Sequence, residues 1–203
     1  MLSISKEIIA ELPAVEYPGQ CHLIESASAA RDAVRYMMKL PRVGFDTETR
    51  PSFQKGKMNK VALLQLATGT ECFLFRLNKI GITEHIKTLL ENRDVMKIGL
   101  STKDDFQAMR RLDPSLNPDG FLELQTWVKK FDILDNSLQK IFAIIFDLRI
   151  SKTQRLTNWE ADELTDSQQQ YAAIDAWACL EIYNHLEAGN FHPEISKYKM
   201  SEE

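Results

Sequence analysis

Short apolar runs alternate along the chain with segments that show the spacing of amphipathic helices. The runs predict strands at residues 43–48, 61–66, 71–76, 95–100 and 121–126. Helical spacing predicts helices over residues 26–40, 80–90, 101–112, 137–146 and 166–186. The turn segment 67–70 predicts a β-hairpin, and Ser101 is a candidate N-cap for the third helix. This order of elements predicts an α/β fold with a mixed central β-sheet flanked by helices.

The pattern predicts one domain with a short extension at each end. Residues 1–24 form an N-terminal lead-in with a short helix and a turn, residues 25–190 form the domain, and residues 191–203 form a C-terminal tail that we expect to fray. A chain of 203 residues, 44% hydrophobic and 27% charged, is long enough to bury a full core without disulfide support. We find no internal repeat that would divide it.

Charge and cysteine usage narrow the class of protein. There are 25 Lys and Arg against 29 Asp and Glu, a net charge of −4, so contacts with phosphates must come from local basic patches or bound cations. Three distant cysteines form no CxxC pair, which argues against a zinc module or a disulfide framework. The first residues lack a signal-peptide pattern, and no run approaches the roughly 20 apolar residues that span a bilayer. We therefore expect a cytoplasmic protein with no membrane partner.

Carboxylates lie next to apolar sequence at three places along the chain. Asp46 and Glu48 end the strand 43–48, and positions two apart on a strand point to the same side. A solvent-facing strand end is the alternative for this pair, and the pair alone does not establish a site. Asp105 lies in the first turn of the helix that follows the strand 95–100, where a role in complementing the helix dipole is the alternative.

The third place is the last helix, where Tyr171 and Asp175 stand four residues apart and share a face. The residues around them are mostly alanine, so the aspartate needs a partner or a metal. A tyrosine packed in the core and an aspartate paired with a basic residue form the alternative.

Together these elements could bring Asp46, Glu48, Asp105 and Asp175 into one oxygen-rich pocket. Four carboxylates and few available histidines favour Mg²⁺ or Mn²⁺ over zinc. Two such ions about 4 Å apart form the arrangement that activates water and stabilises the leaving oxygen in phosphoester displacement.

The acidic residues, in this order and at these separations, resemble the DEDD 3′–5′ exonucleases. More narrowly, they resemble the branch that contains ribonuclease D and the exonuclease domain of the Werner syndrome helicase. The resemblance covers about residues 25–190 and includes the segments 43–48, 55–66, 97–105, 158–159, 164–165 and 171–176. Gln170 stands where another branch of the family has a histidine, so the tyrosine-containing (DEDDy) branch is the one that this chain resembles.

The resemblance implies a ribonuclease H-like fold and a two-metal 3′–5′ exonuclease that releases nucleoside 5′-monophosphates from the 3′ end of DNA or RNA. Asp46, Glu48 and Asp175 would hold the water-activating ion. Asp46 would also hold the second ion, which Asp105 would reach through water. Tyr171 would orient the attacking water with its hydroxyl, so no histidine base is needed.

Candidate substrate contacts lie in two basic segments. Lys55 and Lys57 belong to a loop within residues 49–69, a stretch without acidic residues, and a solvated flexible loop is the alternative. Arg149 and Lys152 belong to a second basic segment.

The second segment continues into positions that the resemblance covers. Arg155 and Trp159 match the helicase-type pattern, and the resemblance implies that Thr47 also contacts the substrate. Trp159 either stacks on a base or packs in the core. Leu156 stands where ribonuclease D proteins often have an arginine, which puts the substrates of ribonuclease D itself in doubt.

A catalytically inactive module on the same fold, binding nucleic-acid ends or a partner protein, is the alternative function. A degenerate relative would lack one of the acidic residues, whereas here all of them and the tyrosine are present. The sequence leaves open the choice between DNA and RNA, between single strands and duplexes, and the oligomeric state.

Overall fold

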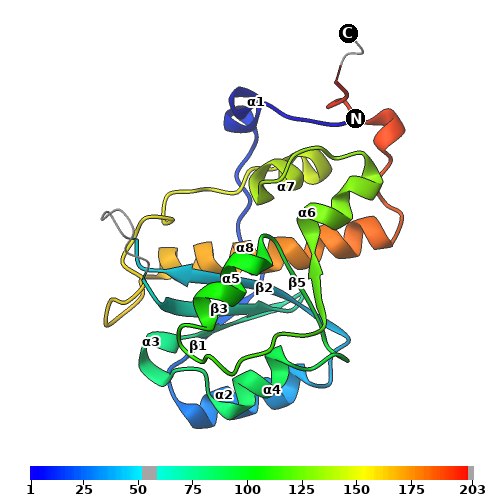
Figure 1. Cartoon of the computed structure of the whole chain (residues 1–203). Coiled ribbons are helices and arrows are strands. Elements are labelled where there is room, and N and C mark those ends of the chain that lie inside the picture. The colour runs from blue at the N-terminus through cyan, green and yellow to red at the C-terminus, as the bar shows by residue number, and fades with distance from the viewer. Residues whose placement is uncertain (52–58, 201–203) are drawn as a thin grey trace.

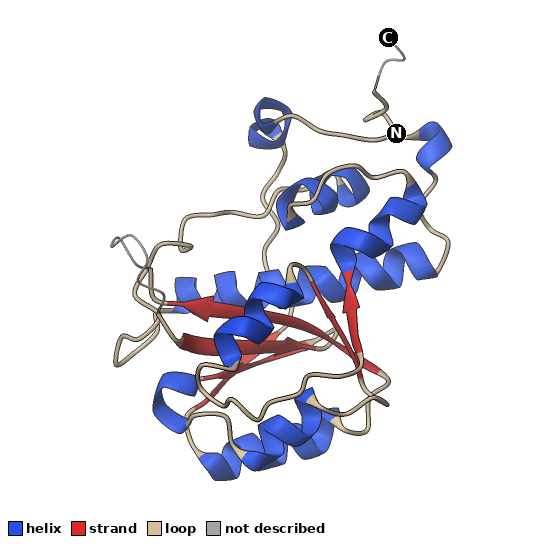
Figure 2. Cartoon of the chain, in the orientation of Figure 1, coloured by secondary structure: helices blue, strands red, loops and turns tan. Residues whose placement is uncertain are grey.

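A computed structural model describes residues 1–51 and 59–200 of the chain. Its centre is a six-stranded sheet with the strand order β1-β4-β3-β2-β5-β6. Figure 1 shows α7 and α8 above the sheet and α2 and α4 below it, and Figure 2 shows the same helices enclosing the strands from both sides. The predicted α/β architecture, a mixed sheet flanked by helices, is confirmed.

The strands of the sheet are short, and β3 is antiparallel to both of its neighbours, whereas the other pairs are parallel. They are β1 (Gln20–Ile24), β2 (Arg42–Thr49), β3 (Val61–Ala67), β4 (Glu71–Phe75), β5 (Met96–Gly99) and β6 (Phe121–Glu123). Every residue of β3 is buried, because α8 covers one of its faces and the α2–α4 layer covers the other. The site-bearing strand β2 lies beside it, in the middle of the sheet.

The helices differ widely in length, and α8 is the longest at 22 residues. They are α1 (Lys6–Glu11), α2 (Ala27–Met37), α3 (Leu77–Ile80), α4 (Glu84–Leu90), α5 (Thr102–Met109), α6 (Leu124–Trp127), α7 (Leu138–Phe146) and α8 (Asp166–Glu187), with 3₁₀ turns at η1 (Val128–Phe131) and η2 (Pro193–Ile195). Within the described ranges, none of these helices is long and apolar enough to pass through a membrane.

The close contact between α8 and β2 depends on Gly44. A Cβ atom at this position would lie 1.9 Å from the carbonyl oxygen of Ala176, so any larger residue would push the helix away from the sheet. The start of α8 is fixed by a capping box, in which the Thr165 side chain accepts from the Gln168 backbone and the Gln168 side chain accepts from the Thr165 backbone. These features set the distance and the register of α8 over β2.

Three predictions about the elements were wrong in detail. The strand β1 was missed because its residues are only partly buried and mix polar with apolar types; it lies within the segment 1–24 and pairs with β4. The helix predicted over 80–90 is interrupted at Gly81, whose φ of +65° ends α3. The strand predicted over 121–126 ends at Glu123, which caps α6.

The predicted cap of α5 and the predicted fraying tail also differ from the structure. Ser101 stands at the N-cap position but adopts a left-handed conformation and makes no capping bond with its side chain. The carboxylate of Glu123 accepts from the backbone N–H groups of Ser101 and Thr102 instead. Near the C-terminus, Tyr198 is buried and donates a hydrogen bond to Asp147, so the described part of the tail is packed rather than frayed.

Candidate active site

The first two acidic residues lie on one face of β2, the face that α8 covers. Asp46 and Glu48 alternate with Thr47, whose side chain points to the opposite face. Gly44 lies on the same face as the two carboxylates and lets α8 approach at that point. The sequence pattern therefore placed this pair on one side of the strand as the structure has it, and the strand end faces a helix rather than open solvent.

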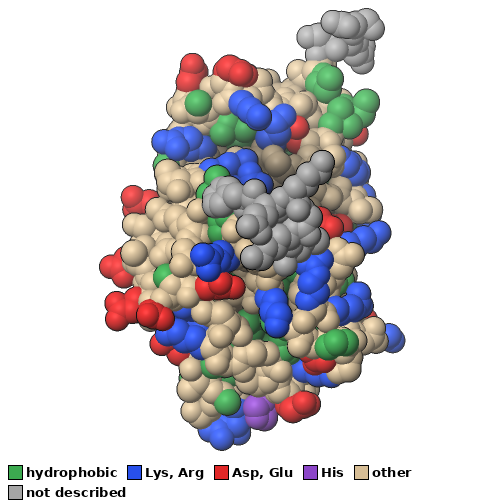
Figure 3. All heavy atoms as spheres, turned by 60° about the vertical axis from the view of Figure 1, so that its left-hand side comes forward, with side chains coloured by type: hydrophobic (Ala, Val, Ile, Leu, Met, Phe, Trp, Pro, Cys, Tyr) green, Lys and Arg blue, Asp and Glu red, His purple; other side chains and the backbone are tan. Residues whose placement is uncertain are grey.

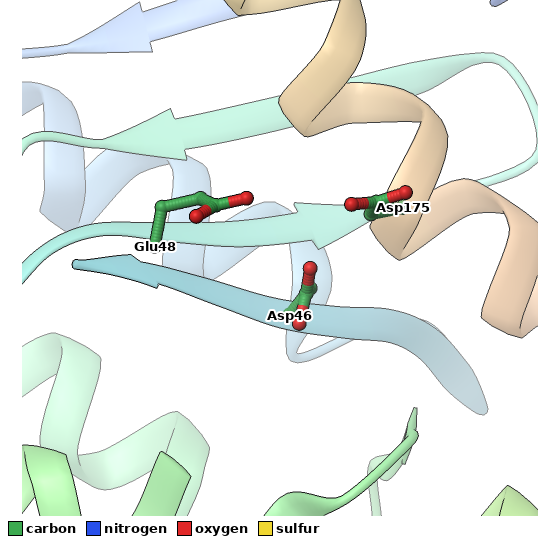
Figure 4. Close-up of side chains that lie close together, drawn as sticks. All are labelled: Asp46, Glu48 and Asp175. Carbon is green, nitrogen blue, oxygen red and sulfur yellow. The ribbon is translucent and has the colours of Figure 1, made fainter. Parts of the chain in front are cut away.

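Asp175 reaches the pair from α8. Asp46, Glu48 and Asp175 each offer one carboxylate oxygen, and these oxygens all lie within 4.8 Å of one another. Figure 4 shows the three side chains directed toward a common point between β2 and α8. Tyr171, one turn earlier on α8, donates a hydrogen bond to the Asp175 carboxylate. The prediction that residues 171 and 175 share a face at the site agrees with this geometry.

Asp105 approaches from α5 and lines the same cleft, but it lies outside the three-carboxylate cluster. Its carboxylate accepts a hydrogen bond of 2.5 Å from the Thr47 hydroxyl. Because a hydroxyl has one proton, the Thr47 hydroxyl in this arrangement donates to Asp105 and not to a substrate. Thr47 was a predicted substrate contact, and in the structure its side chain orients Asp105.

Burial of the carboxylates, and then their closeness to one another, raises their pKa values. Burial, reinforced by the charge of Asp46, raises the pKa of Glu48 to about 10. Burial, then the same neighbour, raises the pKa of Asp105 to about 8. Burial raises the pKa of Asp175 to about 7, although the Tyr171 hydrogen bond and the nearby Lys152 partly oppose it. Without a cation, the site therefore favours protonated carboxyl groups near neutral pH.

The cluster opens into a cleft of about 580 Å³, and two basic side chains line this cleft. Lys152 and Arg155 line the cleft, and the charge of Arg155 lowers the pKa of Glu48 and of Asp175. Arg149, from the same basic segment, donates instead to the backbone oxygen of Leu12. Two of the three basic residues in this segment thus face the acidic cluster.

Trp159 does not reach the cleft as a stacking surface. The side chain is fully buried in the core, and its ring lies 6.0 Å from that of Tyr171. The prediction that it contacts a base is wrong for this structure, because no face of the indole is exposed; the alternative of a core tryptophan holds. Lys55 and Lys57, the other predicted substrate contacts, lie outside the described residues.

On the face shown in Figure 3, Lys and Arg side chains gather across the middle, while Asp and Glu side chains are most numerous along its left-hand side. Arg50, just after β2, pairs with Glu160 at 3.4 Å. The distribution agrees with the expectation that a protein of net negative charge concentrates its basic residues locally.

Sequence reasoning missed the neutral wall of the cleft. Polar residues from the α5 start, α6 and the α7 start line it, namely Ser101, Gln125, Asn136, Ser137 and Gln139. Such residues have no pattern in the sequence that distinguishes them from ordinary surface residues, so only the packing of α6 and α7 reveals them.

The residues present fit a hard divalent cation. The three clustered ligands are all carboxylates, and no histidine of the described residues lines the cleft. Oxygen-only donor sets suit Mg²⁺ or Mn²⁺ rather than zinc. A cation would also offset the burial and the mutual repulsion that raise the carboxyl pKa values. The fold and the site thus define a mixed α/β domain with an acidic cluster compatible with divalent metal.

Comparison with known proteins assigns the family. The model of a 3′–5′ exonuclease domain family matches residues 21–189, most of the chain. The chain belongs to this family of 3′–5′ exonucleases.

The chain also resembles individual relatives. It is 29% identical to the bifunctional 3′–5′ exonuclease/ATP-dependent helicase WRN of Mus musculus over 90% of its own length, and it spans 14% of that protein. The Nibbler EXO domain of Aedes aegypti superposes with a TM-score of 0.75 at 22% identity, covering 87% of this chain and 91% of that one. Trypanosoma brucei RNase D, solved in complex with RNA U12, gives a TM-score of 0.71 at 19% identity and covers 84% of this chain and 63% of that one. These structures share the ribonuclease H-like fold that the family resemblance implied.

Proposed function

We propose that this chain hydrolyses phosphodiester bonds from the 3′ end of a nucleic acid and releases nucleoside 5′-monophosphates. In each cycle the oxygen of a water molecule bonds to the terminal phosphorus, the bond from phosphorus to the preceding 3′ oxygen breaks, and that oxygen takes up a proton. The observation that carries the proposal is the meeting of three carboxylate oxygens within 4.8 Å in a cleft bordered by two basic side chains.

Asp46, Glu48 and Asp175 would hold one divalent cation, and Asp46 with Asp105 a second, so the site is of the DEDDy type. Bound there, two Mg²⁺ or Mn²⁺ ions would activate the attacking water and stabilise the leaving oxygen. The Tyr171 hydroxyl, held beside Asp175, orients the water toward phosphorus. Its own pKa is raised above the usual range by burial and by Asp175, so it acts as a neutral hydrogen-bonding group and not as a base.

The two basic side chains that line the cleft would bind the substrate. We assign Arg155 and Lys152 to the phosphates of the bound strand, because they face the acidic cluster and lie at its open side. The RNA-bound RNase D of Trypanosoma brucei supports a polynucleotide substrate for this fold. We further propose a reducing compartment such as the cytoplasm, in keeping with the free thiols of the three cysteines.

A module that binds nucleic-acid ends without cleaving them is the competing function. The presence of all four acidic residues and of Tyr171 favours catalysis, because a binding module has no need for a carboxylate cluster that repels phosphates.

The test is digestion of matched DNA and RNA oligonucleotides with free 3′-hydroxyl ends, single-stranded and recessed, in Mn²⁺ and in chelator. We expect mononucleotides to appear from at least one substrate with Mn²⁺ and none with chelator. Blocking the 3′ end with a phosphate should slow the reaction, whereas blocking the 5′ end should not.

Two variants separate cleavage from binding. Asp46→Asn should abolish cleavage while the variant still binds the oligonucleotide. Asp94→Asn, which removes an exposed carboxylate before β5, should cleave at the wild-type rate. If folded wild-type protein at micromolar concentration binds these oligonucleotides and shortens none of them, the binding module is the correct function.

A further inference from the structure

Gln65 is an unexplained polar residue in the middle of β3. Its side chain is fully buried, and neither its amide oxygen nor its amide nitrogen has a hydrogen-bond partner among the described residues. Its neighbours in the strand, from Leu63 to Leu66, are otherwise leucines that are fully buried. A buried amide without partners destabilises the folded state, and an apolar residue of the same size would avoid that cost.

The sheet register places this amide beside the acidic cluster. Gln65 and Asp46 are direct partners in the antiparallel pairing of β2 with β3. Side chains of such partners stand on the same face, with their Cβ atoms about 5 Å apart. This is the face against which Ala176 of α8 packs at Gly44, so the amide lies under α8 next to the carboxylate that would be shared by both ions.

The amide of Gln65 can supply a hydrogen-bond donor that the carboxylate of Asp46 lacks. A carboxylate whose oxygens hold cations keeps lone pairs that must be satisfied by donors, and such outer contacts fix its orientation. The carboxylate of Asp46 accepts a hydrogen bond from the backbone of Thr47 but none from a side chain of the described residues. The side chain of Gln65 is long enough to bring its amide nitrogen to Asp46 from the adjacent position on β3. This nitrogen donates to no other group among the described residues.

We infer that Gln65 is a positioning residue, which donates its amide hydrogen to Asp46 when a divalent cation occupies the site and so fixes the orientation of the shared carboxylate. The inference rests on the proposed function, since it requires cation binding at this cluster. It explains why a buried polar residue that weakens the unloaded protein lies in an otherwise apolar strand.

The experiment compares wild type with Gln65→Met, which preserves the length of the side chain, and with Gln65→Leu as a second variant. Thermal melting of each protein is measured in chelator and across a titration with Mn²⁺ alone. We expect both variants to melt at or above the wild-type temperature in chelator, while the Mn²⁺ concentration for half-maximal stabilisation rises about 10-fold. If Gln65 only supported the fold, both variants would melt below wild type in chelator and would keep the wild-type response to Mn²⁺.

Thr68→Val is the matched control, because Thr68, just after β3, is also buried but its hydroxyl has partners in the backbone of Glu71. It should melt below wild type and keep the wild-type response to Mn²⁺. Unchanged Mn²⁺ response in the two Gln65 variants would overturn the inference while leaving the proposed function intact. Absence of any Mn²⁺ response in folded wild type would overturn the proposed function, and the inference with it.

Discussion

Removing one carboxylate from the acidic cluster should stabilise the protein in the absence of metal. The change is Asp175→Asn, which keeps the shape of the side chain and its contact with Tyr171 but removes the charge that faces Asp46 and Glu48. The pKa of Asp175 is raised by burial from 3.8 to about 7. A carboxyl pKa that is higher in the folded state means that wild type loses stability as the pH rises from about 4 through 7, and the variant lacks this loss.

The magnitude follows from the shift of about three pKa units. At about 1.4 kcal/mol per unit, the full loss at pH 8 is about 4 kcal/mol. Solvent in the open cleft screens a partly exposed carboxylate, so we expect about 2 kcal/mol in favour of Asp175→Asn at pH 8 and less than about 1 kcal/mol at pH 5. For a domain of this size, about 2 kcal/mol raises the melting temperature by about 4–8 °C.

The assay is urea unfolding followed by tryptophan fluorescence in chelator at pH 5 to 8. Asp94→Asn serves as the control for loss of a surface carboxylate and should follow wild type at every pH. If Asp175→Asn and wild type show the same free energy of unfolding at pH 8 and the same slope with pH, burial does not disfavour the charged form of Asp175 as the structure implies.

Four further predictions test other parts of the structure. Tyr171→Phe should lower the single-turnover cleavage rate at least 10-fold yet keep the Mn²⁺-induced rise in melting temperature; loss of both would mean that the tyrosine supports the fold instead. Gly44→Ala should destabilise the protein by at least about 2 kcal/mol in urea unfolding, because its Cβ would collide with the carbonyl oxygen of Ala176. Arg76→Met should destabilise it by about 3 kcal/mol, since this fully buried guanidinium donates to the carbonyl oxygen of Ala161 and pairs with an acidic partner; an unchanged urea midpoint would contradict this. The Mn²⁺-induced rise in melting temperature should be larger at pH 8 than at pH 6, because the raised carboxyl pKa values make protons compete with the cation at lower pH.

Much of the fold could be predicted because its elements carry local signals. The hairpin of β3 and β4 follows from two apolar runs around a four-residue turn, and α8 follows from its helical spacing. The strand β1 could not be predicted in this way, since an edge strand with mixed residues has no clear alternation. The break at Gly81 was also missed, because helical spacing continues across it.

The same division holds for the site. Local geometry was enough to place Asp46 with Glu48 and Tyr171 with Asp175, because strand and helix periods relate residues close in sequence. Which of the two interpretations of Trp159 holds depends on burial, and burial depends on what packs around the ring, so the sequence left both open.

By itself the sequence determined the residue types, the order of most strands and helices, and the pairing of functional side chains within one element. Only the tertiary structure decided that α8 lies close enough to β2 for carboxylates 127 or more residues apart to meet. It also decided that Asp105 accepts a hydrogen bond from Thr47 and that Gln65 is buried beside Asp46. The physical reason is that backbone periodicity acts over a few residues. Distances between elements are instead set by the packing of whole faces, here by a missing Cβ at Gly44.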